Sequence, residues 1–458
     1  MRLAYLALIF AVSSLTIVQG ENWPHWRGPN FDGSTSAQDL PTDFNKDYRK
    51  LWTADLSGEG ASTPIVWGDR VFLTLSTPEE KAPPKQEVEE TSGDEASAPE
   101  PPAVGTLAVC LSQKTGEVEW TYVLSEASRD NYRNTLACAS PVTDGEQVFF
   151  FSGDGHLAAC SLEGEKLWSA NLQEKYGPFT VTWTPSSSPL LFEGALYLQV
   201  VQRRERFNGK GAETGNPSYL LALDPATGEE KWRVGRPSKA AGESQESYAS
   251  PIPVSYGDNR ELVLVGADCL TGHSPEDGRE IWRWGAWNPQ RANHWRQVSS
   301  AVYANGVIVA CAPKGGPVYG FSAGVEGLLL KDDFLWFNEK TVITCDVPTP
   351  LYTNEFVFIL NGRQRILSCL SARTGREWWS EAIPTRGAFK ASPTAAGDTV
   401  YLVSEEGEVV LVRASENFEM IHQTNLGELG ASSVESSVVP AGGKIYVRVG
   451  NQLHCFGK

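Results

Sequence analysis

The stretch Ala222-Leu223-Asp224-Pro225-Ala226-Thr227-Gly228-Glu229-Glu230-Lys231-Trp232 decides the fold of this chain. An apolar run enters a Thr-Gly turn, and a tryptophan follows four residues after the glycine. A Thr-Gly or Asp-Gly pair between strand-like runs is typical of a tight hairpin, because glycine adopts positive φ without steric cost. The Gly-x-x-x-Trp phrase occurs five times, at Gly116–Trp120, Gly164–Trp168, Gly228–Trp232, Gly278–Trp282 and Gly375–Trp379. Self-similarity at such a period indicates a repeat architecture.

Each repeat begins with small residues, most of them hydroxyl-bearing, ahead of an apolar strand. Eight such phrases occur: Ser62-Thr63-Pro64, Ser140-Pro141, Ser188-Pro189, Ser250-Pro251, Ser299-Ser300-Ala301, Thr349-Pro350, Ser392-Pro393 and Ser436-Ser437-Val438. A second strand follows after a glycine-containing turn, a third precedes the Gly-x-x-x-Trp turn, and the fourth carries the tryptophan. Four antiparallel strands per unit, repeated radially, predict an all-β fold, a β-propeller.

The two ends of the repeat region complement one another. The eighth repeat stops after its third strand, at 452–456, and the segment 50–54 reads like a tryptophan strand. We expect this N-terminal segment to complete the last blade, because pairing the two removes an open sheet edge. The repeats near Trp336 and Phe418 are degenerate. An eight-bladed propeller is therefore our prediction, and seven blades is the alternative.

The first twenty residues are typical of a secretory signal peptide, with Arg2 ahead of an apolar run and a cleavage site near Gly20. We therefore expect a periplasmic or secreted protein, with residues 21–458 forming a single propeller domain. No later run is long and apolar enough for a transmembrane segment. Residues 79–102 are rich in acids and prolines and predict a disordered acidic insertion.

The net charge limits the classes of partner, and the positions of the cysteines bear on whether disulfides form. The formal net charge of −17 argues against nucleic acid and against anionic membrane surfaces. Eight cysteines in an exported chain allow disulfides. However, Cys110 and Cys369 occupy equivalent repeat positions, as do Cys160 and Cys455, which favours small buried strand residues. The pairing of the cysteines stays open.

The stretch 222–232 resembles the repeat of pyrroloquinoline-quinone-like propellers, a group that includes quinoprotein alcohol dehydrogenases and the BamB scaffold of outer-membrane protein assembly. The opening Asn22-Trp23-Pro24-His25-Trp26-Arg27-Gly28-Pro29-Asn30 resembles the leader of exported BamB-like bacterial propellers. The resemblance covers residues 22–458 and implies the fold. A dehydrogenase of this kind would need an adjacent-cysteine disulfide, calcium ligands and a catalytic aspartate, and the sequence contains no Cys-Cys pair. We therefore expect no catalytic, metal-binding or cofactor-binding residues and no bound pyrroloquinoline quinone.

The links between blades hold the least repetitive and most chemically varied residues. Each link ends at the mouth of the central channel, and polar and aromatic side chains on loops held by a rigid ring are typical of binding sites. The candidate residues are Arg129, Arg133, Asn134, Trp183, Tyr248, His294, Trp295, Arg296, Asp346, Lys390 and Glu435. The alternative is a set of solvated loops, and Trp295 in particular fits a plug between the fourth and fifth blades.

Three functions follow from this reading. The first is an exported, monomeric, non-catalytic scaffold that binds a protein or polymeric partner in the cell envelope through its channel face. The second is an oxidoreductase that uses a quinone or another cofactor in the channel. The third is a hydrolase, whose paired carboxylates would stand roughly 5–10 Å apart.

Overall fold

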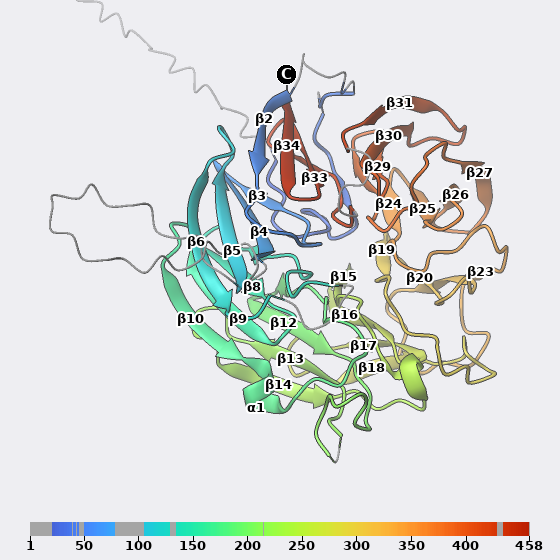
Figure 1. The fold of residues 1–458 in the computed structure, drawn as a ribbon. Coiled ribbons are helices and arrows are strands. Elements are labelled where there is room, and N and C mark those ends of the chain that lie inside the picture. The colour runs from blue at the N-terminus through green and yellow to red at the C-terminus, as the bar shows by residue number, and fades with distance from the viewer. Residues whose placement is uncertain are drawn as a thin grey trace, which may run out of the picture.

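The computed structural model describes residues 21–38, 40–42, 44, 50–77, 105–128, 134–213, 215–427 and 434–457. The predicted signal peptide, residues 1–20, and the predicted acidic insertion, residues 79–102, lie outside the described residues. Eight antiparallel sheets stand around a common axis (Figure 1). The predicted eight-bladed propeller is thus confirmed, and the seven-bladed alternative is wrong.

Each blade contains four antiparallel strands that follow one another outward from the axis. The first four blades comprise β3 (Ile65–Trp67), β4 (Arg70–Thr77), β5 (Gly105–Ser112) and β6 (Val118–Ser125); β7 (Val142–Thr143), β8 (Gln147–Phe151), β9 (His156–Ser161) and β10 (Lys166–Asn171); β11 (Leu190–Phe192), β12 (Ala195–Val200), β13 (Tyr219–Leu223) and β14 (Glu230–Gly235); and β15 (Ile252–Tyr256), β16 (Asn259–Gly266), β17 (Cys269–His273) and β18 (Glu280–Trp284).

The remaining blades repeat this order. They comprise β19 (Val302–Ala304), β20 (Val307–Cys311), β21 (Val318–Ser322) and β23 (Trp336–Asn338); β24 (Leu351–Thr353), β25 (Phe356–Asn361), β26 (Ile366–Ser371) and β27 (Glu377–Ala382); β28 (Thr394–Ala396), β29 (Thr399–Val403), β30 (Glu408–Arg413) and β31 (Met420–Asn425); and β32 (Val439–Ala441), β33 (Lys444–Val449) and β34 (Gln452–Gly457). Two short strands extend blades as parallel fifth strands: β1 (Ser34–Thr35) joins β28, and β22 (Gly327–Leu328) joins β18.

The ring closes through β2 (Lys50–Asp55), which pairs with β34 and supplies the fourth strand of the eighth blade, as the sequence predicts. Trp52 lies opposite Cys455 in this ladder, and Thr53 Oγ1 lies 3.0 Å from His454 Nδ1. In Figure 1 the blue β2 runs beside the red β34. The N-terminal strand β2 thus becomes the outermost strand of the eighth blade and ties the start of the described ring to its end.

The Gly-x-x-x-Trp phrase joins neighbouring blades. The tryptophan of one blade lies on the turn glycine of the next, so that a Cβ on Gly228 would be 2.5 Å from Trp168 Cε3. Trp168 Nε1 also donates to Pro225 O, beside that turn, at 2.8 Å. Equivalent contacts pair Trp52 with Gly116, Trp120 with Gly164, Trp232 with Gly278 and Trp336 with Gly375. The glycine is needed both for its positive φ and for the space that its missing side chain leaves.

The four repeat cysteines are small buried strand residues. Cys110, Cys369 and Cys455 pair across the sheet with Trp120, Trp379 and Trp52, and all eight cysteines lie outside disulfides. Trp336 of the degenerate fifth repeat donates to Ala372 O of the next blade at 3.0 Å. It therefore performs the same packing as the regular tryptophans in spite of its irregular spacing.

The segment from Trp23 to Thr35 crosses the ring. Trp23 pairs with Val66 of the first blade, and Pro24 O accepts from Thr143 N of the second. Further on, β1 pairs with β28 of the seventh blade. Since the second blade faces the sixth and seventh across a ring of eight, this segment passes over the axis. We call it the strap.

The remaining regular elements are short. Helix α1 (Leu172–Tyr176) begins after Asn171, whose side chain accepts from the backbone of Gln173 and Glu174, and a 3-10 turn, η2, spans Gly242–Gln245. Among the described residues, no helix has the length and apolar composition needed to cross a membrane.

Candidate functional site

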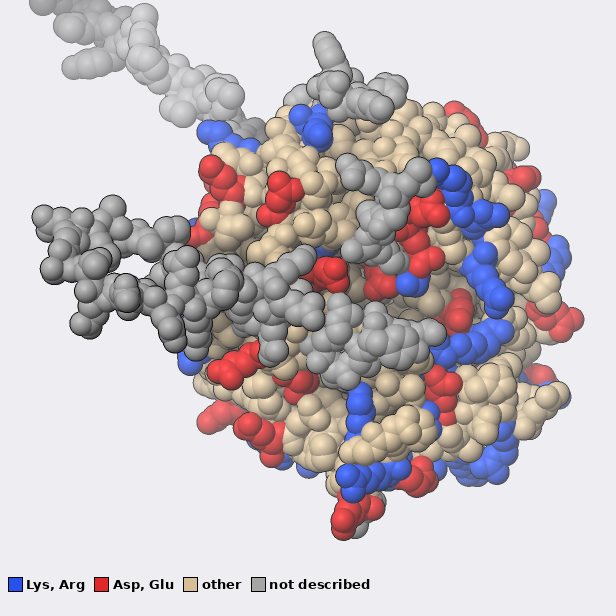
Figure 2. Space-filling view, viewed as in Figure 1, with Lys and Arg blue, Asp and Glu red and all other residues tan. Residues whose placement is uncertain are grey.

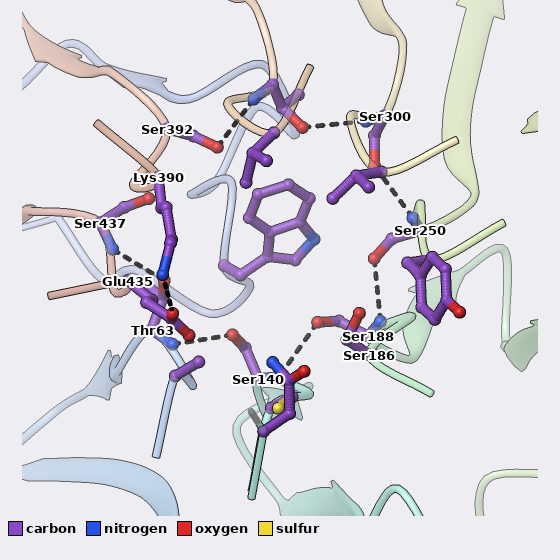
Figure 3. A pocket seen from close by; sticks show the side chains of 18 of the residues that line it. Thr63, Ser140, Ser186, Ser188, Ser250, Ser300, Lys390, Ser392, Glu435 and Ser437 are labelled. Atoms are coloured by element: carbon purple, nitrogen blue, oxygen red, sulfur yellow. Dashed lines mark hydrogen bonds and ion pairs between the residues drawn. The ribbon is translucent and has the colours of Figure 1, made fainter. Parts of the chain in front are cut away.

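A cavity of about 530 Å³ lies on the ring axis, and every blade contributes to its wall. The residues that begin the innermost strands form a belt of hydroxyl groups around it: Thr63, Ser140, Ser188, Ser250, Ser300, Thr349, Ser392 and Ser437. Figure 3 shows the labelled members of this belt facing a common opening. The repeated phrase at the start of each blade therefore places one hydroxyl per blade at the same height in the channel.

Backbone hydrogen bonds connect the hydroxyl belt from blade to blade. Thr63 N donates to Ser140 Oγ at 2.9 Å, and Ser140 N donates to Ser188 Oγ at 3.0 Å. The same bond recurs from Ser188 to Ser250, Ser250 to Ser300, Ser300 to Thr349, Thr349 to Ser392 and Ser437 to Thr63, at 2.8–3.1 Å. Because these N–H groups are buried, each hydroxyl satisfies a donor that would otherwise cost free energy. The small hydroxyl residues at the blade starts are thus explained by packing as well as by the channel.

Charged side chains at the cavity are held in ion pairs. Lys390 Nζ lies 2.7 Å from Glu435 Oε1 and 2.9 Å from Glu405 Oε1. Burial alone would lower the pKa of Lys390, but the hydrogen bonds that its ammonium donates to these carboxylates outweigh burial and raise the pKa. Arg296 NH1 lies 3.2 Å from Glu243 Oε1. Figure 2 shows side chains of both charges around the centre of this face.

A buried polar network supports the aromatic side of the cavity. The Tyr248 hydroxyl donates to Glu246 Oε2 at 2.6 Å and accepts from Trp183 N at 3.0 Å. Glu246 also accepts from Thr182 N and Oγ1 and from Arg203 Nε. Burial, reinforced by the neighbouring carboxylate, raises the pKa of Tyr248 well above its ordinary value. The phenol therefore stays protonated and the tyrosine ring is held in place.

The strap contributes Trp26 to the cavity wall. The indole Nε1 is buried and has no hydrogen-bond partner among the described residues. The adjacent Arg27 is buried and donates to Pro350 O at 2.7 Å and to Pro393 O at 2.9 Å. Burial lowers the pKa of Arg27 to about 10, so its guanidinium remains charged at neutral pH and anchors the strap to two blades.

The strap and the inter-blade links lie on opposite sides of the hydroxyl belt. The link residues precede the belt hydroxyls in the chain, as Lys390 precedes Ser392. The strap bonds to residues that follow the belt, such as Thr143 and Pro393. Because the innermost strands of all blades run in the same direction, the strap closes one end of the channel. Trp26 forms the floor of a cavity that opens towards the links.

The candidate residues from the sequence separate into three groups. Six of them line the cavity: Asn134, Trp183, Tyr248, Arg296, Lys390 and Glu435. Three lie elsewhere: His294 is exposed, Trp295 packs against the core of the fourth and fifth blades, and Asp346 pairs with Lys314 at 3.7 Å. Arg129 and Arg133 lie outside the described residues.

Sequence reasoning missed the floor of the cavity and one cysteine in its wall. Trp26 was part of the leader motif, but nothing in its spacing places it on the axis. Cys138 also lines the cavity and is half-buried, whereas the other seven cysteines are buried. The residues of the hydroxyl belt could be recognised in the sequence as the start of each repeat. Their position in the channel could not.

The blades and the axial cavity define a radial propeller with a pocket on its channel face. The family model described as outer membrane protein assembly factor BamB matches residues 102–201, 211–417 and 334–452. The chain therefore belongs to this family of pyrroloquinoline-quinone-like β-propellers.

One curated relative and several solved structures are similar to the chain. Quinohemoprotein alcohol dehydrogenase of Comamonas testosteroni is 29% identical over 140 residues, which cover 28% of this chain and 18% of that protein. The match thus spans less than a fifth of the relative's length. The structure of BamB from Moraxella catarrhalis aligns with a TM-score of 0.52 at 11% identity, over 77% of this chain and 94% of that one. A europium-containing methanol dehydrogenase aligns with a TM-score of 0.64 at 10% identity, over 96% and 98% of the two chains.

Proposed function

We propose that this protein is an exported, non-catalytic binding module that holds a protein or polymeric partner of the cell envelope at its channel face. The observation that carries this proposal is the construction of the cavity. Six side chains, each from a different link between blades, converge on one opening, and the ring behind them is held rigid by hydrogen bonds between blades. Rigid presentation of aromatic and charged groups is what a recognition surface requires.

The match to the BamB family supports a binding role in the envelope. The solved relative from Moraxella catarrhalis carries that name and shares the fold. Export is supported by the signal-like residues 1–20 of the sequence, and we propose that the mature chain acts as a monomer.

The side chains of the cavity do not fit a calcium-bound quinone. Calcium takes six to eight oxygen ligands, with carboxylates prominent among them. The carboxylate that lines this cavity, Glu435, is held by Lys390, and the belt oxygens accept backbone N–H groups. Among the described residues, no group of three or more His, Cys, Asp or Glu side chains is placed to hold a metal ion. We therefore derive no reaction through the quinone.

An oxidoreductase remains the second candidate function, because part of the chain is 29% identical to a quinohemoprotein alcohol dehydrogenase. Titration of the full chain with pyrroloquinoline quinone and calcium, followed by an alcohol oxidation assay with an electron-accepting dye, tests it. Saturable binding with turnover would overturn the non-catalytic proposal.

Chemical cross-linking in envelope extracts tests the binding role. We expect the wild-type chain to yield a discrete cross-linked species, and the double substitution Arg296→Ala and Trp183→Ala to weaken it without lowering the melting temperature. Arg413→Ala is the control, because Arg413 lies in a surface ion-pair cluster with Asp398 and Glu419. Equal cross-linking by both variants would show that the channel face is not the binding surface.

A further inference from the structure

We propose that the axial cavity binds the terminal sugar of a neutral glycan, with the sugar ring stacked on Trp26. This inference rests on the proposed function, since it names the ligand chemistry of the channel face. Three properties of the cavity carry it: a neutral hydroxyl wall, an aromatic floor with an unused donor, and a closed end.

The wall favours a ligand rich in hydroxyl groups. Seven of the belt oxygens each accept one backbone N–H from the neighbouring blade, and each of these hydroxyls can still donate its own proton. A hydroxyl both donates and accepts, so a ligand bearing several hydroxyls can satisfy such a belt. An apolar ligand would leave these groups desolvated without partners, at a cost in affinity.

The floor adds a flat apolar surface and a donor. The Trp26 Nε1 proton is buried and has no partner among the described residues, while the indole borders the cavity. A ligand oxygen that enters the cavity would satisfy this donor once the indole turns its Nε1 towards it. A sugar ring combines an apolar C–H face with oxygens at its rim, which matches an indole with an unused N–H.

The electrostatics disfavour charged ligands. The basic groups at the cavity, Lys390 and Arg296, are each held by carboxylates. The Tyr248 phenol is kept neutral by burial. An anion would have to displace these carboxylates, and a cation would have to displace the basic groups. A neutral ligand leaves the existing pairs in place.

The closed end selects for chain termini. Arg27 fastens the strap to Pro350 and Pro393, and Trp23 fastens its start to Val66, so a polymer cannot thread through the ring. A ligand reaches Trp26 only by inserting an end from the side of the links. The cavity volume of about 530 Å³ falls in the range of small-ligand sites, about 300–1,000 Å³, which suits a few residues at the end of a glycan.

The test uses the full chain and linear neutral oligosaccharides of glucose, galactose, mannose and N-acetylglucosamine, measured by titration calorimetry. At least one of these series should bind. Its affinity per chain end should be the same for a tetrasaccharide and a long polymer of the same sugar, because only ends enter. Affinity that rises with chain length would overturn end-on binding, and binding by none of the series would overturn the glycan proposal.

Cys138 provides a second readout, because it is the half-buried cysteine and borders the cavity. The bound oligosaccharide should slow its alkylation by N-ethylmaleimide, and Cys138→Ser identifies the labelled site. Trp26→Ala should weaken binding by about tenfold or more, which corresponds to about 1.4 kcal/mol. Unchanged binding in this variant would contradict the assigned floor.

Ser186→Phe keeps the test decisive if Trp26→Ala fails to fold. Ser186 lines the cavity from a link and is half-buried, so a phenyl ring there should block entry while the strap stays intact. Peptides that protect Cys138 where glycans do not would sink the glycan inference and leave the proposed binding role standing. Both proposals fail if neither glycans nor peptides protect Cys138 and if the substitutions of Arg296 and Trp183 do not change the yield of cross-linked species in envelope extracts.

Discussion

Trp168 lies on Gly228 of the next blade so closely that a Cβ on the glycine would be 2.5 Å from its ring. The contact recurs between four other pairs of blades. It explains why glycine and tryptophan repeat together: one copy supplies the ring, and the following copy supplies the space for it. The motif is therefore a joint between blades as well as a hairpin turn.

Substituting this glycine should destabilise the protein more than its backbone conformation alone requires. Gly194 has φ of 71° with nothing within 4 Å of an added Cβ, whereas Gly228 has φ of 72° against Trp168. Gly194→Ala should cost about 1–2 kcal/mol, the price of a left-handed residue. Gly228→Ala should cost about 1–3 kcal/mol more, because Trp168 must move.

A double-mutant cycle in urea separates the two contributions. In a Trp168→Ala background, Gly228→Ala should cost no more than Gly194→Ala does. Additive effects of the two substitutions would mean that the ring and the glycine are energetically independent, contrary to the joint described above.

Removing one hydroxyl of the belt should leave a buried N–H without a partner. Ser188→Ala deprives Ser140 N of its acceptor and should lower the free energy of unfolding by about 1–3 kcal/mol. Ser188→Thr should restore most of it, since Thr63 and Thr349 fill the same role in other blades. Ser186→Ala is the matched control, since it is a half-buried cavity residue outside the belt. Chemical denaturation measures all three, and equal losses for Ser188→Ala and Ser186→Ala would contradict the role of the belt.

Acid should weaken the closure of the ring. Burial, with a smaller contribution from Lys50, lowers the pKa of His454 to about 4, below the value of about 6.5 in an unfolded chain. The unfolded state therefore takes up a proton first, so this stability is fully present above about pH 6.5 and is lost as the pH falls towards 4. The loss from this residue should reach up to about 2 kcal/mol at pH 5.

His454→Asn isolates this effect, because the amide can keep the bond to Thr53 and does not titrate. The other buried histidines, His25 and His273, respond equally in both proteins. Unfolding free energies of wild type and variant should therefore diverge between pH 7 and pH 5. Parallel curves would show that His454 does not set the acid sensitivity.

Deleting residues 79–102 and inserting a short Gly-Ser bridge should leave the melting temperature nearly unchanged. The β4–β5 ladder ends at the pair Thr77 and Gly105, which a short turn can join. Shortening a long loop changes closure entropy by only about a kcal/mol. A melting temperature lowered by about 10 °C or more in scanning calorimetry would mean that the acidic segment packs on the ring.

The fold could be predicted because the residues that make its main contacts recur in each repeat of the sequence. Trp232 and Gly278 belong to one repeating pair, so each copy confirms the others. The strap repeats nothing, and its bonds join Arg27 to residues 323 and 366 positions away, which no local pattern indicates. The placement of Trp26 on the axis could therefore not be predicted from the sequence.

The candidate site could be predicted only to the level of the links that carry it. Which of two neighbours faces the channel depends on the alternation of side chains along extended backbone. Arg296 lines the cavity, whereas Trp295 beside it packs into the fourth and fifth blades. The spacing of these residues in the sequence could not decide which of the two side chains faces the channel.

The pairing of β2 with β34 has a consequence for biogenesis. Thr53 and His454 are 401 residues apart, so the eighth blade cannot assemble until nearly all of the chain has been synthesised. Before then, the N-terminal strand has no partner and the ring no closure. Such a delay would suit the export proposed above, in which the chain would cross a membrane before it folds. In this propeller the delay follows from topology, because the strand that leaves the ribosome early must wait for the one that leaves late.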